Sequence, residues 1–483
     1  MTDVHNAGQR YHAFFQALGP TQLWTLARVK RFVETWFAFP AFRDQVSIIA
    51  RENRRFNSVC DDYGIEIDPA DIVPSLNIAG IAPGAACPSP ALQLWLDYRR
   101  QLADLRKKVT QAGDTGGTNP AFDRWRRRQI SRSQGVLGKT AAYITHPVIA
   151  FELSDGCSVG CWFCGISAGR FAGHWSYQQN AHEWRDILRE TVGFFGPAAG
   201  TGFCYWATDP SDNPNYADFV ADFAEVTGFM PVTTTAAPLR DVTMMRRVMD
   251  LTNRMQGLPN RFSILTPRQL KDLFLAFGPD ELLHVDLLLH MRGSLQPKSI
   301  AGRARLRRGE RDVPQQMDDA TIACVSGFLV NLPRRHIRLV TPVPSSDDLP
   351  DGFRVLGESS FTDAPSFGAA LHSLANRHMI QGLGRGDVLR LRPEVICETV
   401  EDGFVLTYGK VRHTVSGGVA GRLRRTLLAR NQTVGDACAD FGTGLRELFD
   451  MSRTIEALFD AGVLLEPDEC TRASVADTSL AAA

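Results

Sequence analysis

The sequence predicts an α/β protein organised around an open, partial (β/α)6 barrel of the TIM type. Three observations support this fold class. Short β-prone runs alternate with amphipathic helical runs between residues 145 and 345, a long helical region precedes them, and a small unit of strands and helices follows. Strand–helix alternation is typical of parallel sheets, and six units are too few for an eight-stranded barrel.

Each unit of the expected barrel joins one β-prone run to the helical run after it. The expected strands are Val148–Leu153, Gly202–Ala207, Pro231–Thr235, Arg261–Leu265, Val285–His290 and Ile337–Pro342. The expected helices are Glu183–Val192, Asn215–Val226, Val242–Gln256, Pro267–Phe277 and Asp318–Asn331. In this architecture the functional residues follow the carboxyl ends of the strands.

The rest of the chain divides around this barrel. We expect a helical N-terminal region at 1–140, the barrel at 141–345, a connecting segment at 346–387, a winged-helix-like unit at 388–467 and a disordered tail at 468–483. Apolar residues at helical spacing mark N-terminal helices around Leu26–Phe37 and Trp95–Val109, and Pro120 begins another. Its arginines predict a solvated face more than a binding patch: Arg124, Arg126, Arg127 and Arg128.

The C-terminal unit has the sequence outline of a winged helix. Leu389–Val400 and Gly403–Tyr408 predict a hairpin, and helices are expected near 417–430, 433–441 and 451–461. Such a unit can bind a peptide as an added strand, or it can bind DNA through Arg422, Arg424 and Arg425. The chain's net charge of zero disfavours nucleic acid as a partner.

Composition and cysteine usage further limit the class of protein and the compartment in which we expect it. The chain has 483 residues, of which 44% are hydrophobic and 22% charged, typical of a globular protein. Its ten cysteines are mostly scattered singly, which indicates a reducing compartment and no disulfide framework. We find neither a secretory signal nor an apolar run long enough to span a membrane, so we expect a cytoplasmic protein without a membrane partner.

The chemistry centres on Cys157, Cys161 and Cys164, at C-x3-C-x2-C spacing directly after the first expected strand. Three thiolates on one loop can hold an iron–sulfur cluster and leave one iron open. The alternative is structural zinc, which needs four ligands, and His174 is the available fourth. The absence of a second cysteine pair favours the cluster.

This motif, with the aromatic Phe163 before the last cysteine, resembles the radical S-adenosylmethionine superfamily. The resemblance implies that the three cysteines bind a [4Fe–4S] cluster whose open iron chelates S-adenosyl-L-methionine, and that reduction releases a 5′-deoxyadenosyl radical. It also implies an electron donor of the flavodoxin or ferredoxin type.

Further family positions match less closely. Ala207-Thr208-Asp209-Pro210 stands where the family has a Gly-Gly-Glu-Pro-like stretch, so these residues are expected to contact the S-adenosylmethionine amino group. Ser263 would contact the ribose and Val340 would back the adenine. The alternatives are a turn built by Asp209 and Pro210, and a buried serine bonded to backbone.

The whole chain resembles the proteusin-type radical epimerases, which convert L- to D-residues in a ribosomally made precursor peptide that carries a leader. Inversion requires a hydrogen atom on the face opposite abstraction, and a cysteine thiol is a natural donor. Flanking polar residues favour Cys397. The other candidates are Cys204 in an expected core strand, Cys324 in an expected helix and Cys438 in a peripheral helix.

Other functions remain open at this point. The lack of further cysteine clusters disfavours thioether formation, but another radical peptide modification such as carbon–carbon cross-linking is an alternative. A metal-stapled binding or regulatory protein is the non-enzymatic alternative. The basic run Lys298–Arg308 predicts either a solvated loop or a site for an acidic leader.

Overall fold

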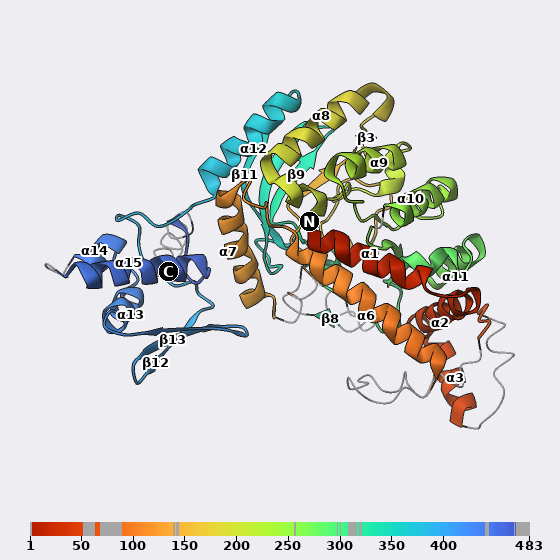
Figure 1. Cartoon of the computed structure of the whole chain (residues 1–483), viewed down its shortest axis with the longest axis horizontal. Coiled ribbons are helices and arrows are strands. Elements are labelled where there is room, and N and C mark those ends of the chain that lie inside the picture. The colour runs from red at the N-terminus through yellow and green to blue at the C-terminus, as the bar shows by residue number, and fades with distance from the viewer. Residues whose placement is uncertain are drawn as a thin grey trace.

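The structure is a computed structural model. It describes residues 2–51, 63–67, 89–138, 141, 144–255, 257–296, 298–299, 301–307, 316–317, 321–439, 444–467 and 469. A large α/β body carries a smaller C-terminal unit at one end (Figure 1). The expected disordered tail lies outside the described residues, except for Glu469. No helix in the described ranges is long and apolar enough to cross a membrane.

The N-terminal region is helical, as predicted, in its described parts. Its helices are α1 (Thr2–Gln16), α2 (Pro20–Ala38), α3 (Pro40–Arg51), α6 (Pro90–Gln111) and α7 (Pro120–Val136). The side chains of Ser89 and Asn119 accept hydrogen bonds from the first turns of α6 and α7, which fixes where these helices begin. Helices α1 and α6 pack together through a core that includes Tyr11, Tyr98 and Leu102.

The body contains parallel strands in two hydrogen-bonded groups, β1 with β9 and β4–β5–β6. Phe203 forms a parallel bridge to Ala150 of β1. The strands are β1 (Ile149–Glu152), β4 (Thr234–Thr235), β5 (Asn260–Ile264), β6 (Val285–Leu289), β9 (Gly327–Asn331), β10 (His336–Pro342) and β11 (Phe353–Ser360). The helices around them are α8 (Tyr177–Phe195), α9 (Tyr216–Thr227), α10 (Val242–Arg254), α11 (Pro267–Ala276) and α12 (Ala364–His378). No sheet is closed among the described residues, so the partial barrel stays a prediction.

Three sequence expectations for this body are wrong. The run Gly202–Ala207 is not a strand, because within it only Phe203 pairs, through an isolated bridge to Ala150. The run Asp318–Asn331 is not a helix in its described part, because Gly327–Asn331 forms β9 and pairs in parallel with β1. Residues 336–342 form a strand, as predicted, but β10 runs antiparallel to β9 and β11. A short, continuously buried apolar run is compatible with either a helix or a central strand, and here its pairing decides for the strand.

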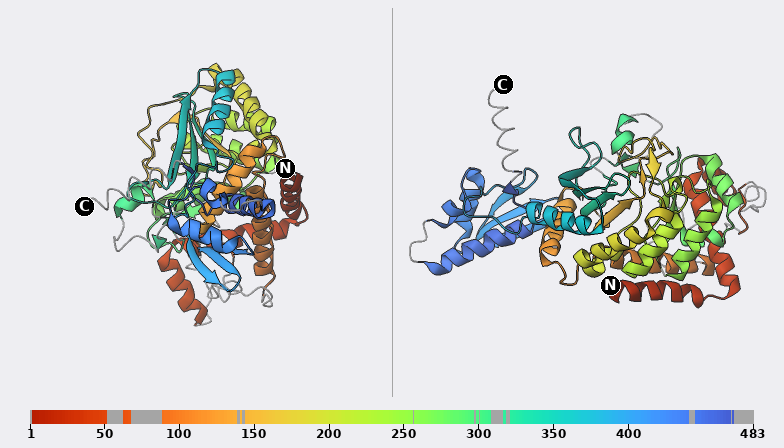
Figure 2. Two further views of the ribbon diagram at one scale, coloured as in Figure 1. Left: turned by 90° about the vertical axis from the view of Figure 1, so that its left-hand side faces the viewer. Right: turned by 90° about the horizontal axis from the view of Figure 1, so that it is seen from above.

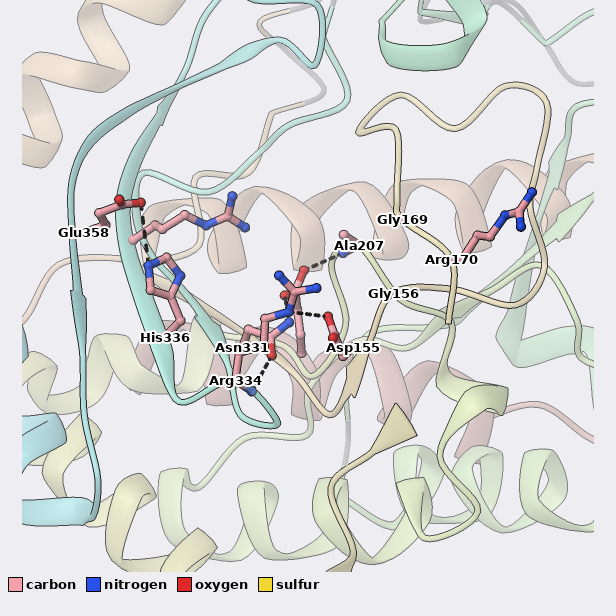
Figure 3. A pocket seen from close by; sticks show the side chains of 11 residues that line it. Asp155, Gly156, Gly169, Arg170, Ala207, Asn331, Arg334, His336 and Glu358 are labelled. Atoms are coloured by element: carbon pink, nitrogen blue, oxygen red, sulfur yellow. Dashed lines mark hydrogen bonds and ion pairs between the residues drawn. The ribbon is translucent and has the colours of Figure 1, made fainter. Parts of the chain in front are cut away.

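The sheet β1–β9–β10–β11 separates two apolar layers. On its outer face Phe151 packs edge-on to Trp184 of α8 with ring centroids 5.0 Å apart. Helices α8 and α12 lie side by side over that face (Figures 1 and 2). Side chains alternate between the two faces of a strand. Those on the opposite, inner face form a separate cluster that includes Ala150, Leu329 and Val340. Toward the carboxyl end of β1 the same inner face becomes polar (Figure 3).

The C-terminal unit has its own apolar core. It consists of β12 (Ile396–Val400), β13 (Gly403–Tyr408), β14 (Val411–Ser416), α13 (Ala420–Ala429), α14 (Val434–Cys438) and α15 (Leu445–Asp460). The expected hairpin and helices are present, but its first strand begins at Ile396, not Leu389. The antiparallel strand β14 was not expected from the sequence. The winged-helix assignment stays a prediction.

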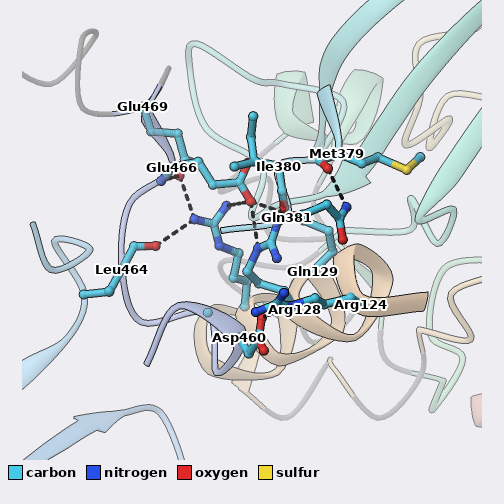
Figure 4. A network of polar contacts seen from close by, with 12 residues as sticks. Arg124, Arg128, Gln129, Met379, Ile380, Gln381, Asp460, Leu464, Glu466 and Glu469 are labelled. Atoms are coloured by element: carbon cyan, nitrogen blue, oxygen red, sulfur yellow. Dashed lines mark hydrogen bonds and ion pairs between the residues drawn. The ribbon is translucent and has the colours of Figure 1, made fainter. Parts of the chain in front are cut away.

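Helix α7 joins the two parts through its arginines, which contradicts the expected solvated face. Arg128 is fully buried and its Nε donates to the Glu466 carboxylate at 2.9 Å. Arg124 pairs with Asp460 of α15 at 2.7 Å (Figure 4). Arg126 is also buried and donates to the carbonyl oxygen of His146. Because α7 lies between the body and the C-terminal unit, three of these arginines make tertiary contacts, whereas Arg127 is exposed as predicted.

Candidate functional site

The three cysteines of the motif lie on one loop at the carboxyl end of β1. Short strands β2 (Ser154–Asp155) and β3 (Gly173–His174) pair and close its base. The backbone N–H of Cys157 donates to the carbonyl oxygen of Gly169 at 2.9 Å. Gly156 has a φ of 73°, and a Cβ there would stand 2.2 Å from a backbone oxygen, so only glycine permits this tight entry into the loop.

The cysteine thiols share one electrostatic environment. Burial, together with smaller contributions from Cys157 and Cys164, raises the pKa of Cys161 to about 12. Burial also raises the pKa of Cys157 to about 11, while the backbone N–H groups of Val159 and Gly160 oppose that shift. The backbone N–H of Ala168 donates to Cys164 Sγ at 3.3 Å. The sulfurs are therefore close together and receive backbone hydrogen bonds.

Three cysteine thiols on one loop are a donor set that an iron–sulfur cluster can use. No three Cys, His, Asp or Glu side chains in the described ranges are arranged to hold one ion, and His174 lies on β3 at the loop base. Cluster thiolates each bind a different iron, so they need not converge on one point. Backbone N–H groups directed at sulfur tune such clusters, and the loop supplies them.

The positions expected to contact S-adenosylmethionine lie in different surroundings. The Phe163 ring stacks on His290, which follows β6, with centroids 3.8 Å apart. The Thr208 hydroxyl is buried without a hydrogen-bond partner among the described residues. Ser263 is buried on β5, and Val340 is buried in the inner-face cluster. A buried hydroxyl without a hydrogen-bond partner can bind a polar group of a ligand.

The contacts of Asp209 are those of the turn-building alternative, and its expected contact with S-adenosylmethionine stays a prediction. Its Oδ1 accepts hydrogen bonds from the Ser211 N–H and from the hydroxyls of Ser211 and Thr235, and its Oδ2 accepts one from the Ala236 N–H. Asp209 therefore caps the turn that begins at Pro210 and ties it to β4, as in the alternative that the sequence left open.

Two buried acids near the loop were missed by the sequence analysis. Glu152, at the end of β1, accepts from the backbone N–H of Ala207 at 2.9 Å and from Asn331 at 2.8 Å. Burial raises its pKa, and these bonds oppose the shift. Asp212 accepts from the Ser158 N–H at 2.9 Å and pairs with Arg240, which anchors the cysteine loop. An isolated acid within or after a strand carries no sequence signal for such a role.

A pocket of about 370 Å³ opens beside the loop at the polar end of the inner face. Figure 3 shows Arg334 directed at Asp155 and His336 at Glu358, and the facing nitrogen and oxygen atoms lie 2.8 and 3.6 Å apart. The guanidinium of Arg338 lies over the Phe353 ring, 6.0 Å from its centroid. The pocket's size is within the range of ligand sites, and its lining offers both charges.

The candidate hydrogen donors fall into different environments. Cys397 lies on β12, paired with Leu406, in the C-terminal unit, apart from the body that carries the cysteine loop (Figure 1). Cys438 packs against that same distant core, and Cys204 is buried in the core behind the sheet. Cys324 is not in a helix, contrary to expectation, and packs in the inner-face cluster.

The surroundings of Cys324 connect it with the cysteine loop. Its cluster includes Ile166 of that loop as well as Tyr205 and Ala207. Burial raises the pKa of Cys324 to about 11, and the positive charge of Arg261 opposes the shift. The thiol is therefore protonated at neutral pH. The structure brings Cys324, and not Cys397, to the inner face beside the motif.

Together these features define an α/β protein with a three-cysteine loop at the end of a parallel strand and an inner face beside it. Over 470 residues, 95% of this chain and 91% of the relative, the chain is 37% identical to a protein of Sinorhizobium fredii whose printed name is "Uncharacterized protein y4wI". The chain belongs to the same family as that protein. No family model and no solved structure match it.

Proposed function

We propose that this protein is a cytoplasmic radical S-adenosylmethionine enzyme that converts L- to D-amino acid residues in a ribosomally made precursor peptide. The observation that carries the proposal is the loop that holds Cys157, Cys161 and Cys164 at the carboxyl end of β1. A [4Fe–4S] cluster held by these thiolates, with S-adenosylmethionine at its open iron, would supply the 5′-deoxyadenosyl radical that removes a Cα hydrogen.

Residues around the loop orient the bound molecules. The unpartnered hydroxyl of Thr208 is free to bond a polar group, and Ser263 is buried on β5. Glu152 holds the backbone of Ala207 next to the pocket. Val340 and its cluster provide an apolar wall from which water is excluded. The peptide would lie along the inner face, with polar groups of its chain at the charged pocket.

The returning hydrogen atom would come from Cys324, since Cys397 lies apart from the loop. The S–H bond breaks homolytically, a C–H bond forms at Cα, and a thiyl radical remains on the protein. One electron and one proton then restore the thiol, with a reductant of the flavodoxin or ferredoxin type as the electron source. Burial supports this role, because it keeps Cys324 as a thiol and not a thiolate.

The C-terminal unit would bind the leader of the precursor peptide. Strand β12 stands at the edge of its three-stranded sheet, and Ile396 and Val400 are exposed on it. An edge strand with free backbone groups can accept a peptide as an additional strand. Contacts of α7 with this unit would then keep the leader at a fixed position relative to the body.

Two measurements test the proposal. Anaerobically purified protein is expected to show iron–sulfur absorbance with about four irons per chain, whereas a colourless zinc protein would refute the radical chemistry. Coexpression with the precursor peptide in deuterated water is expected to add a deuterium to each inverted residue. Unlabelled product, or a product that has lost two hydrogens through bond formation, would contradict epimerisation.

A further inference from the structure

A short segment crosses the cysteine loop and is bonded to it at three points. This segment is the turn η6 (Gly302–Arg307), part of the basic run singled out in the sequence. The Arg303 backbone N–H donates to the carbonyl oxygen of Cys164 at 2.9 Å. Its guanidinium donates to the carbonyl oxygen of Cys161 at 3.3 Å and to that of Ala168. One residue thus spans the second half of the loop.

The position of this segment is fixed by close packing. Gly302 has a φ of 53°, and a Cβ there would stand 2.4 Å from the carbonyl oxygen of Cys164. The Gly302 N–H donates to the carbonyl oxygen of Pro350 at 2.7 Å, on the side away from the loop. Arg303 is therefore held against the cysteines by its backbone as well as by its side chain.

Among the described residues, no acid pairs with Arg303. Its guanidinium meets carbonyl oxygens and no carboxylate in the described part of the chain. The next arginine in the segment differs, because Arg305 pairs with Asp347 and donates to the carbonyl oxygen of Ser345 at 3.1 Å. The two arginines form a natural pair for comparison: one bonded to the cysteine loop and one bonded away from it.

We propose that Arg303 is a positioning residue that holds the cysteine loop in its ligand-binding form and raises the reduction potential of the bound cluster. Reduction adds a negative charge, and a fixed cation nearby stabilises the reduced form more than the oxidised form. The fork of the guanidinium also bridges two carbonyl oxygens, which a single ammonium group cannot do in the same geometry. This inference rests on the proposed function, because it concerns the same cluster.

The test compares reconstituted full-length proteins under anaerobic conditions. Iron per chain and the midpoint potential of the cluster are measured for the wild type, Arg303→Gln, Arg303→Lys and Arg305→Gln. For Arg303→Gln we expect a more negative midpoint potential and faster loss of iron to a chelator. For Arg303→Lys we expect a potential near that of the wild type but faster iron loss, and for Arg305→Gln we expect no change in either.

The outcomes distinguish failure of the proposed function from failure of the inference about Arg303. A wild-type protein that binds no cluster would refute the proposed function and this inference together. A wild-type cluster whose potential is unchanged in Arg303→Gln would overturn the inference alone, as would equal shifts in Arg303→Gln and Arg305→Gln. If Arg303→Gln does not fold, Arg303→Lys decides: a potential as in the wild type with weaker iron retention supports the inference, and unchanged retention overturns it.

Discussion

Replacing Cys324 by alanine is expected to abolish inversion while radical formation continues. The substitution removes one sulfur atom from the inner-face cluster and leaves every neighbouring side chain in place. One lost heavy atom in an apolar site costs about 1 kcal/mol of unfolding free energy, so the variant remains folded. Without the thiol, the Cα radical has no hydrogen donor on the face opposite abstraction.

The expected loss in D-residue formation is about 100-fold or more, which corresponds to about 2.7 kcal/mol in the barrier. The assay follows two products from the same reaction, 5′-deoxyadenosine and D-residues after peptide hydrolysis. In Cys324→Ala the first is expected to form in the presence of peptide and the second to be lost. A Cα radical that is not quenched by the thiol can also recover hydrogen from the abstraction face, which returns the L-residue.

The matched control is Cys397→Ala. Cys397 is partly buried on β12, and burial raises its pKa while Arg424 opposes the shift, but its neighbours belong to the C-terminal core. We expect this variant to retain inversion. Normal D-residue formation by Cys324→Ala would refute the assignment. Loss of inversion in Cys397→Ala with unchanged peptide binding would return the donor to the position that the sequence favoured.

Three further predictions concern stability and ligand binding. Arg128→Met leaves Glu466 buried without its closest cation and should lower the free energy of unfolding in urea by about 3 kcal/mol. The control Arg127→Met, at an exposed position, should change this free energy little. Equal effects of the two substitutions would contradict the role of α7 in holding the two parts together. Thr208→Val should weaken S-adenosylmethionine binding roughly 10-fold without lowering stability, and unchanged affinity would remove Thr208 from the site. Burial lowers the pKa of His146 to about 3, so this side chain is neutral in the folded protein. Its contribution to stability is lost as the pH falls below the pKa of histidine in the unfolded chain. The free energy of unfolding should therefore drop by about 2 kcal/mol between pH 8 and pH 5, and by less in His146→Asn.

The sequence predicted the local structure around the motif better than the pairing of strands. The run before Cys157 was expected to be a strand and is β1, because its apolar residues are bounded by turn signals. The run that ends at Asn331 was assigned to a helix because it is apolar and follows a polar stretch. Its partner, β1, lies far away in the sequence, and no local pattern records that pairing.

The same limit explains why the sequence favoured Cys397 as donor, whereas the proposal of Cys324 rests on the tertiary structure. Polar neighbours around Cys397 indicated an accessible strand, and β12 is indeed partly exposed. Accessibility, however, says nothing about which surface the strand faces. Cys324 lies in an irregular segment, and only the neighbouring strand β9 brings it to the inner face beside the loop. Its role depends on the tertiary arrangement and not on its flanking residues.

The two arginine-rich segments also show that the local sequence does not reveal which tertiary contacts a charged side chain makes. The α7 arginines and the run at 298–308 carry similar charge density, and each predicted a solvated surface. In the folded chain Arg128 is buried against Glu466, whereas Arg303 binds the carbonyl oxygens of the cysteine loop. A guanidinium keeps its charge when buried and can satisfy several acceptors, so arginine suits both positions. For Arg303 the proposed role in tuning a cluster therefore follows from the place of its acceptors, which are backbone carbonyl oxygens of the cysteine loop.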